Sequence, residues 1–155
     1  MERFDVVVIG GGPSGATAAC DLARTGRNVL LLDRAGRIKP CGGAVPPRLL
    51  EEFEIPPALL VARAKSARMI APSDRTVDMP VGEIGFVGMV DRDHFDEWLR
   101  ERAAMAGAKR QTGTYETIER DGLAGAVVVY REGRGGELRR VRAALVIGAD
   151  GARSG

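Results

Sequence analysis

Two short apolar runs near the start of the chain predict strands that are buried on both faces. The runs FDVVVI (4–9) and NVLLLD (28–33) lack the regular alternation with polar residues that a half-exposed strand shows. The segment between them, residues 14–25, is rich in alanine at helical spacing, and Gly26 stands where such a helix would end. This strand–helix–strand order predicts a βαβ unit with parallel strands.

The middle of the chain has a different pattern, with many glycines and prolines and short β-like runs. From Arg34 the sequence predicts a loop, followed by a short helix over residues 47–53 that begins at a proline. Residues 67–71 and 76–79 predict two strands around a tight turn, and residues 86–90 predict a further strand. We expect this part to be a β-rich insertion.

A long helix and three strands are predicted for the rest of the chain. Asp91 can cap a helix over residues 91–106, whose apolar positions fall on one face: Phe95, Trp98, Leu99, Ala103 and Ala106. Strands are predicted over residues 109–119, 126–131 and 137–148. The fold class expected from the whole pattern is α/β, a Rossmann-like domain whose parallel sheet carries helices and is interrupted by the β-rich insertion.

Composition and charge exclude several classes of protein. The chain has 155 residues, 21 of them glycine, and a net charge of +2 without a basic stripe, so no nucleic-acid partner is expected. The two cysteines, Cys20 and Cys41, form neither a disulfide framework nor a metal-ligand pattern, which fits a reducing, cytoplasmic location. A single histidine, His94, argues against a histidine-based metal site or a Ser-His-Asp triad. The sequence shows neither a membrane span nor a signal peptide.

A glycine-rich turn between the first strand and the first helix is the strongest chemical signal. It reads Gly10-Gly11-Gly12-Pro13-Ser14-Gly15 and matches the GxGxxG pattern that lets backbone N–H groups meet a pyrophosphate at a helix N-terminus. Asp33 ends the second strand, where its carboxylate can accept a hydrogen bond from a ribose 2′-hydroxyl. The pair favours FAD or NAD over NADP, and a turn without a ligand is the alternative.

A second glycine turn, at the end of the last strand, helps to distinguish an FAD-binding domain from an NAD-binding domain. A simple NAD domain would continue with further βαβ repeats, whereas here a β-rich insertion follows and residues 148–154 read GADGARS. This second turn contributes Asp150 and Gly151 as candidates for the neighbourhood of the pyrophosphate. Together the two turns favour a flavin domain.

These motifs resemble those of a known family. Residues 10–15 with Asp33 and Arg34, and residues 148–154, resemble the para-hydroxybenzoate-hydroxylase-like FAD flavoproteins. The segment KPCGGAVP (39–46) and the helix start MVDRDHFDEWL (89–99) are similar to those of the geranylgeranyl reductases, closest to the branch of bacteriochlorophyll and chlorophyll biosynthesis. The likeness runs from residue 3 to residue 155 and implies that residues 1–155 are the N-terminal part of an FAD/NAD(P)-binding domain, without the substrate domain.

The resemblance implies an FAD-dependent oxidoreductase that reduces C=C bonds of a geranylgeranyl chain with NADPH as reductant. The chain to be reduced would be carried on a diphosphate or a chlorophyllide ester, and the insoluble substrate implies peripheral contact with a photosynthetic membrane. Two alternatives stay open: a flavin monooxygenase on the same fold, and a truncated fragment that binds a nucleotide without turnover.

The resemblance also assigns roles to single residues. It places the loop of Cys41, Gly42 and Gly43 beside the flavin ring, and Cys41 is the candidate catalytic residue, as a proton donor, with an inert buried cysteine as the alternative. Arg37 and Lys39 could favour its thiolate. Arg92 is expected to contact FAD, and Arg34 to contact the adenosine.

Overall fold

The computed structural model describes residues 1–34, 40–81, 85–122, 125–133 and 135–151. The chain divides into two compact units, one of residues Met1–Arg37 with Asp96–Gly155 and one of residues Ile38–Phe95. The first unit therefore contains both predicted glycine turns and Asp33, whereas the second contains Cys41 and Arg92. Each unit is described by itself.

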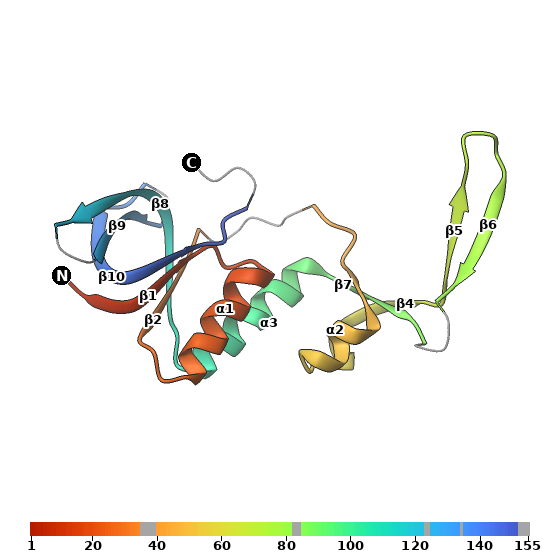
Figure 1. The fold of residues 1–155 in the computed structure, drawn as a ribbon, viewed down its shortest axis with the longest axis horizontal. Coiled ribbons are helices and arrows are strands. Elements are labelled where there is room, and N and C mark those ends of the chain that lie inside the picture. The colour runs from red at the N-terminus through yellow and green to blue at the C-terminus, as the bar shows by residue number, and fades with distance from the viewer. Residues whose placement is uncertain (35–39, 82–84, 123–124, 134, 152–155) are drawn as a thin grey trace. The chain divides into compact units, whose positions relative to one another are not determined.

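Five strands of the first unit close into a ring: β1 (Arg3–Ile9), β2 (Val29–Asp33), β8 (Lys109–Asp121), β9 (Gly125–Glu132) and β10 (Leu138–Gly148) (Figure 1). β1 pairs in parallel with β2 and β10, and β2 pairs in parallel with β8. β8, β9 and β10 form an antiparallel meander. The parallel βαβ start is confirmed, whereas the return of the meander onto the parallel strands was not predicted.

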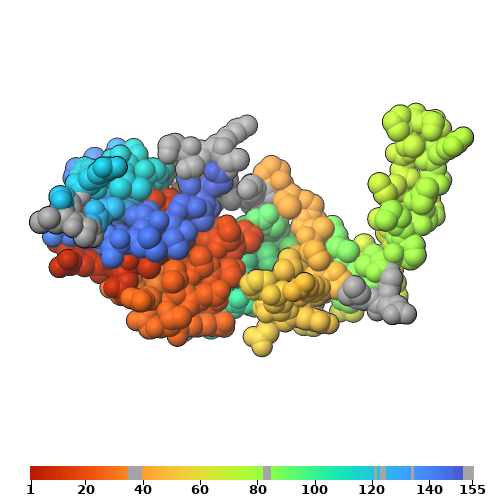
Figure 2. Space-filling model, in the orientation of Figure 1, coloured from red at the N-terminus to blue at the C-terminus, as the bar shows by residue number. Residues whose placement is uncertain are grey.

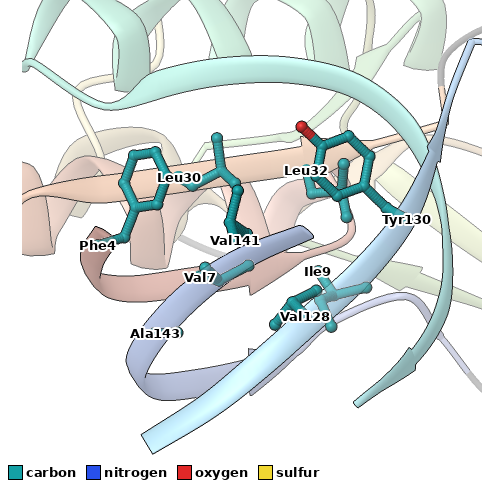
Figure 3. Close-up of a cluster of buried hydrophobic side chains, with 9 residues drawn as sticks. All are labelled: Phe4, Val7, Ile9, Leu30, Leu32, Val128, Tyr130, Val141 and Ala143. Atoms are coloured by element: carbon teal, nitrogen blue, oxygen red, sulfur yellow. The ribbon is translucent and has the colours of Figure 1, made fainter. Parts of the chain in front are cut away.

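The ring closes because β8 and β10 are long enough to pair with two neighbours each. The first residues of β8 pair with β2 and the rest with β9, and β10 divides in the same way between β9 and β1. Buried apolar side chains of four strands converge inside the ring (Figure 3): Phe4, Val7, Ile9, Leu30, Leu32, Val128, Tyr130, Val141 and Ala143. This core holds the carboxyl ends of β1, β2 and β10 in a fixed register.

Helix α1 (Pro13–Arg24) and most of helix α3 (Arg92–Met105) belong to the first unit. Helix α1 contacts β1 and β2 and buries Ala16, Ala19 and Ala23, and Gly26 follows it at φ +79°. Helix α3 starts as predicted, because the backbone N–H of Asp93 donates to Oδ1 of Asp91 at 3.0 Å. Phe95, Leu99 and Ala103 are buried on its apolar face.

The second unit contains the predicted insertion. Its elements are β3 (Ala44–Val45), α2 (Pro47–Glu52), a 3₁₀ turn (Pro57–Leu59), β4 (Leu60–Ala64), β5 (Ser66–Ile70), β6 (Thr76–Pro80) and β7 (Val87–Val90). β3, β7 and β4 form one small sheet, and β5 pairs with β6 in the predicted hairpin. Every residue of this hairpin is exposed, and Figure 2 shows it projecting from the rest of its unit. The strands β3 and β4 were missed.

Candidate functional site

The glycine turn leaves β1 at a position that only glycine fits. Gly10 is buried at φ +107°, and its N–H donates to the carbonyl oxygen of Leu32 at 2.8 Å. A Cβ on Gly10 would lie 2.5 Å from the carbonyl oxygen of Ala149. Backbone from β10 thus approaches the turn too closely for any side chain.

The other two glycines of the motif have opposite surroundings. A Cβ on Gly15 would collide with the carbonyl oxygen of Gly10, so the helix packs directly against the turn. A Cβ on Gly12 would meet nothing within 4 Å. Gly12 is the N-cap of α1 and Pro13 follows at the first helical position; no side chain caps the helix, and Ser14 is exposed. The turn is therefore closed beneath Gly15 and open at the helix N-terminus, where a pyrophosphate fits.

The second glycine turn lies beside the first, because β10 is the parallel neighbour of β1. The N–H of Ala149 donates to the carbonyl oxygen of Ile9 at 2.7 Å. Asp150 and Gly151 follow, both exposed, and Gly151 adopts φ +97°. Both turns thus occupy the carboxyl edge of the parallel strands, the edge at which ligands bind in such sheets. Residues 152–154 of the predicted motif lie outside the described residues.

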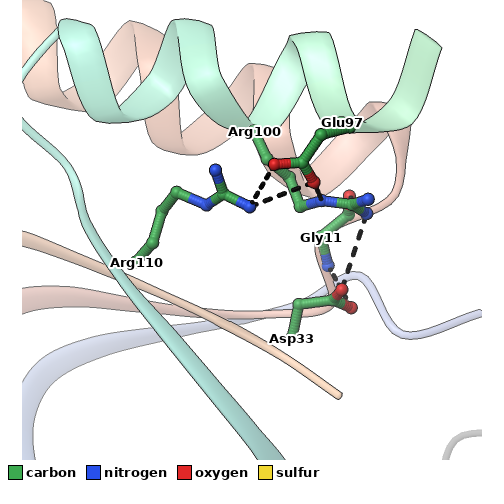
Figure 4. Close-up of polar contacts among 5 residues, drawn as sticks. All are labelled: Gly11, Asp33, Glu97, Arg100 and Arg110. Carbon is green, nitrogen blue, oxygen red and sulfur yellow. Dashed lines mark hydrogen bonds and ion pairs between the residues drawn. The ribbon is translucent and has the colours of Figure 1, made fainter. Parts of the chain in front are cut away.

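Asp33 is tied to the glycine turn by a direct contact (Figure 4). The N–H of Gly11 donates to Oδ1 of Asp33 at 3.0 Å, and Oδ2 of Asp33 lies 3.5 Å from Nη1 of Arg100. The same Nη1 donates to the carbonyl oxygen of Gly11 at 3.1 Å. Arg100 and Asp33 are both largely buried, with side chains 19% and 26% exposed. The carboxylate predicted to bind a ribose is therefore held in one orientation.

Glu97 continues this cluster. Nε of Arg100 donates to Oε2 of Glu97 at 2.9 Å, and Nη2 of Arg110 donates to Oε1 at 2.8 Å. Burial of Glu97 acts to raise its pKa, but the hydrogen bonds and charges of Arg110 and Arg100 outweigh it, so its pKa is lowered. A pocket of about 120 Å³ lies beside this cluster. It is lined by the charged residues Asp33, Glu97, Arg100 and Arg110, together with Leu31, Gln111 and Thr112.

The first unit contains residues that could hold the adenosine diphosphate half of FAD. The N-terminus of α1 is open at Gly12, and the carboxylate of Asp33, which borders a partly apolar pocket, accepts the N–H of the neighbouring Gly11. The exposed Arg34 follows Asp33 directly. Among the described residues, no group of three or more His, Cys, Asp or Glu side chains could hold a metal ion.

The remaining predicted site residues belong to the second unit. Cys41 and Gly42 are exposed, so Cys41 is not a buried cysteine; the buried cysteine is Cys20. Arg92 is partly buried in the first turn of α3. Their predicted contacts with flavin stay predictions. Arg37 and Lys39 lie outside the described residues.

Gly43 gives the Cys41 loop a position that requires glycine. It is buried at φ +70°, a Cβ there would collide with the carbonyl oxygen of Val90, and its own carbonyl accepts a hydrogen bond from Val90 N–H at 2.9 Å. We expect Gly43→Ala to lower the free energy of unfolding by about 2 kcal/mol, measured by urea denaturation. Gly42→Ala is the matched control, because a Cβ on Gly42 meets nothing within 4 Å. Equal stability of the two variants would contradict the close approach.

Sequence reasoning missed several residues of the site, among them Gly11, Glu97 and Arg100. Gly11 is needed because a Cβ there would lie 2.8 Å from Cβ and Cγ of Asp33, and the motif pattern leaves that position free. Glu97 and Arg100 show an acid–base pair at i,i+3 on a predicted helix, which is a signal of mutual pairing only. Their approach to Asp33 depends on the packing of α3 beside the carboxyl end of β2.

Family models match most of the chain. A model described as FAD dependent oxidoreductase matches residues 5–55, and one described as FAD binding domain matches residues 60–155. The chain belongs to the FAD-binding-domain family. This assignment confirms the predicted fold class, a mixed sheet with helices and strand-rich parts of the kind found in FAD-dependent oxidoreductases.

Relatives of this FAD-binding chain include named reductases. It is 60% identical over 152 residues to geranylgeranyl diphosphate reductase of Rhodobacter capsulatus, covering 98% of the chain and 38% of that protein. The chloroplastic geranylgeranyl diphosphate reductase of Oryza sativa is 37% identical, with 99% and 35% covered. A geranylgeranyl bacteriochlorophyll reductase-like crystal structure from Thermoplasma acidophilum superposes with a TM-score of 0.84 at 31% identity, covering 97% of this chain and 40% of that one.

The predicted resemblance to geranylgeranyl reductases is thereby confirmed. The chain spans somewhat more than a third of the length of these relatives. In the part of the chain that the structure describes, no helix is long and apolar enough to cross a membrane.

Proposed function

We propose that this chain is the FAD-binding part of a reductase that saturates C=C bonds of a geranylgeranyl chain, with NADPH as the reductant. The observation that carries the proposal is the meeting of two glycine turns and Asp33 at one edge of the parallel strands. The 60% identity to a protein named geranylgeranyl diphosphate reductase supports the substrate class.

Different residues of the chain would bind different parts of FAD. The N-terminus of α1, where Gly12 has no side chain, would bind the pyrophosphate. The adjacent turn of Asp150 and Gly151 would cover it. Asp33 would accept a hydrogen bond from the adenosine ribose. FAD, when bound, supplies hydride transfer to the alkene.

An isolated alkene also needs a proton on its second carbon. Cys41 is the candidate residue of this chain for that donation: its thiol is exposed, on a loop whose shape is fixed by Gly43. The loop would lie against the flavin and bring the thiol to the substrate.

The wider setting is part of the same proposal. The chain would form the N-terminal part of a flavoprotein whose remaining part holds the prenyl substrate; the relatives are more than twice as long as the chain. The acceptor would be a diphosphate or a chlorophyllide ester. The enzyme would work in the cytoplasm, in peripheral contact with a photosynthetic membrane.

A chimera tests the function. This chain would replace the matching residues of the Rhodobacter capsulatus relative, and NADPH-dependent reduction of geranylgeranyl diphosphate would be followed by mass spectrometry. We expect products that gain pairs of hydrogens, and a loss of turnover of roughly tenfold or more in Cys41→Ala. Unchanged turnover and product pattern in Cys41→Ala would refute the role of Cys41 alone. A folded, FAD-loaded chimera that consumes oxygen without reducing the prenyl chain would refute the reductase.

A further inference from the structure

The pocket beside Asp33 is lined by charges of alternating sign. Four side chains form a row of ion pairs (Figure 4). Arg110 lies 2.8 Å from Glu97, and Glu97 lies 2.9 Å from Arg100. Arg100 in turn lies 3.5 Å from Asp33. Two carboxylates and two guanidiniums sum to no net charge. All four side chains belong to the first unit, on the ends of β2 and β8 and on α3.

Glu97 is the member that pairs with both arginines. Its Oε2 accepts from Nε of Arg100 at 2.9 Å, and Nη2 of Arg110 reaches Oε1 at 2.8 Å and Oε2 at 3.1 Å. A single carboxylate thus pairs with two guanidiniums, of which Arg100 is the more deeply buried.

Arginine side chains beside a ribose site affect which nucleotide binds there. In dinucleotide sites an acidic residue after the second strand accepts the ribose 2′-hydroxyl, whereas a nearby arginine accommodates a 2′-phosphate. This pocket contains both kinds of group: Asp33 beside two arginines. Whether the pocket accepts a ribose with a free 2′-hydroxyl or one with a 2′-phosphate depends on whether the arginines are held in ion pairs with carboxylates.

We propose that Glu97 sets the nucleotide specificity of this pocket: by pairing with Arg100 and Arg110 together it denies a 2′-phosphate both guanidiniums, so the pocket selects adenosine with a free 2′-hydroxyl. The inference rests on the proposed binding of FAD. Its value to the enzyme is that NADPH, whose ribose carries that phosphate, is kept out of the adenosine site of FAD.

Removal of the Glu97 charge changes the net charge of the pocket. Glu97→Gln leaves one positive charge in excess beside the ribose, and at a separation of several ångströms in a partly solvated pocket this favours an added phosphate by about tenfold. The side chain of Glu97 is 43% exposed, so the substitution leaves the core intact.

The test compares two ligands that differ only by the 2′-phosphate. ADP-ribose and ADP-ribose 2′-phosphate would compete with FAD for the chain at low salt, with bound flavin followed by fluorescence. We expect Glu97→Gln to improve the affinity ratio of the phosphorylated ligand about tenfold. Glu101→Gln, on the exposed face of the same helix, should leave the ratio unchanged.

A second change restores the original balance. In Glu97→Gln/Arg110→Gln the excess charge is gone, so the ratio should return to the wild-type value. An unchanged ratio in Glu97→Gln, or a shift of equal size in Glu101→Gln, would overturn the inference while FAD binding to the wild-type chain persists. Absence of FAD binding to the folded wild-type chain would instead refute the proposed function, and the inference with it. Circular dichroism confirms folding, and Glu97→Ala repeats the test.

Discussion

Gly15→Ala is expected to lower the free energy of unfolding by about 3 kcal/mol or more. The new Cβ would collide with the carbonyl oxygen of Gly10, and neither atom can move away, because Gly10 is itself held by hydrogen bonding to Leu32 and by the close backbone of Ala149. Alanine is a better helix former than glycine by only about 1 kcal/mol, which does not offset the collision. Urea denaturation followed by circular dichroism measures the change.

Gly12→Ala is the matched control in the same turn. It adds the same methyl group where nothing lies within 4 Å, at φ −72°, which alanine adopts freely. We expect its stability to stay within about 0.5 kcal/mol of the wild type, whereas FAD affinity falls about tenfold or more because the methyl group occupies the space before the helix N-terminus. Full FAD affinity in Gly12→Ala would contradict the position assigned to the pyrophosphate, and an undiminished stability of Gly15→Ala would contradict the close packing.

The sequence was most informative where the determinants are local. β1, α1 and β2 follow from buried runs, an alanine-rich helix and glycines at its ends, and the structure agrees with all three. The cap of α3 at Asp91 and the β5–β6 hairpin have equally local signals. The glycine motif fixed the place of the candidate site, because its spacing has meaning only between a strand and a helix.

The missed features depend on pairing between distant segments. β4 is short and mostly exposed, and it exists as a strand because β7 pairs with it. The ring of strands closes because β8 and β10 each change partners along their length, which no periodicity predicts. In the site, Arg100 reaches Gly11 across 89 positions of the chain. Arg100 lies beside Asp33 only because distant segments of the chain pack together in the fold.

Asp33→Ala is expected to weaken FAD binding by about ten- to a hundredfold. The variant loses the carboxylate proposed to bind the ribose hydroxyl, a charge-assisted hydrogen bond worth about 1.5–3 kcal/mol. It also leaves Gly11 N–H without its 3.0 Å acceptor, and Arg100 loses its ion pair with Asp33 but keeps the one with Glu97. Titration of the chain with FAD, followed by quenching of flavin fluorescence, gives the dissociation constant.

Two further substitutions separate recognition of the ribose from support of the turn. Asp33→Asn keeps an oxygen for Gly11 N–H but removes the charge, so it should retain the stability of the wild type better than Asp33→Ala while losing most of the same FAD affinity. Asp5→Asn is the control, since Oδ2 of Asp5 likewise accepts a backbone N–H, that of Asn28 at 2.8 Å. We expect it to leave FAD affinity unchanged. If Asp33→Asn binds FAD as tightly as the wild type, Asp33 supports the turn without contacting the ribose, and the adenosine must be held by other groups of the pocket.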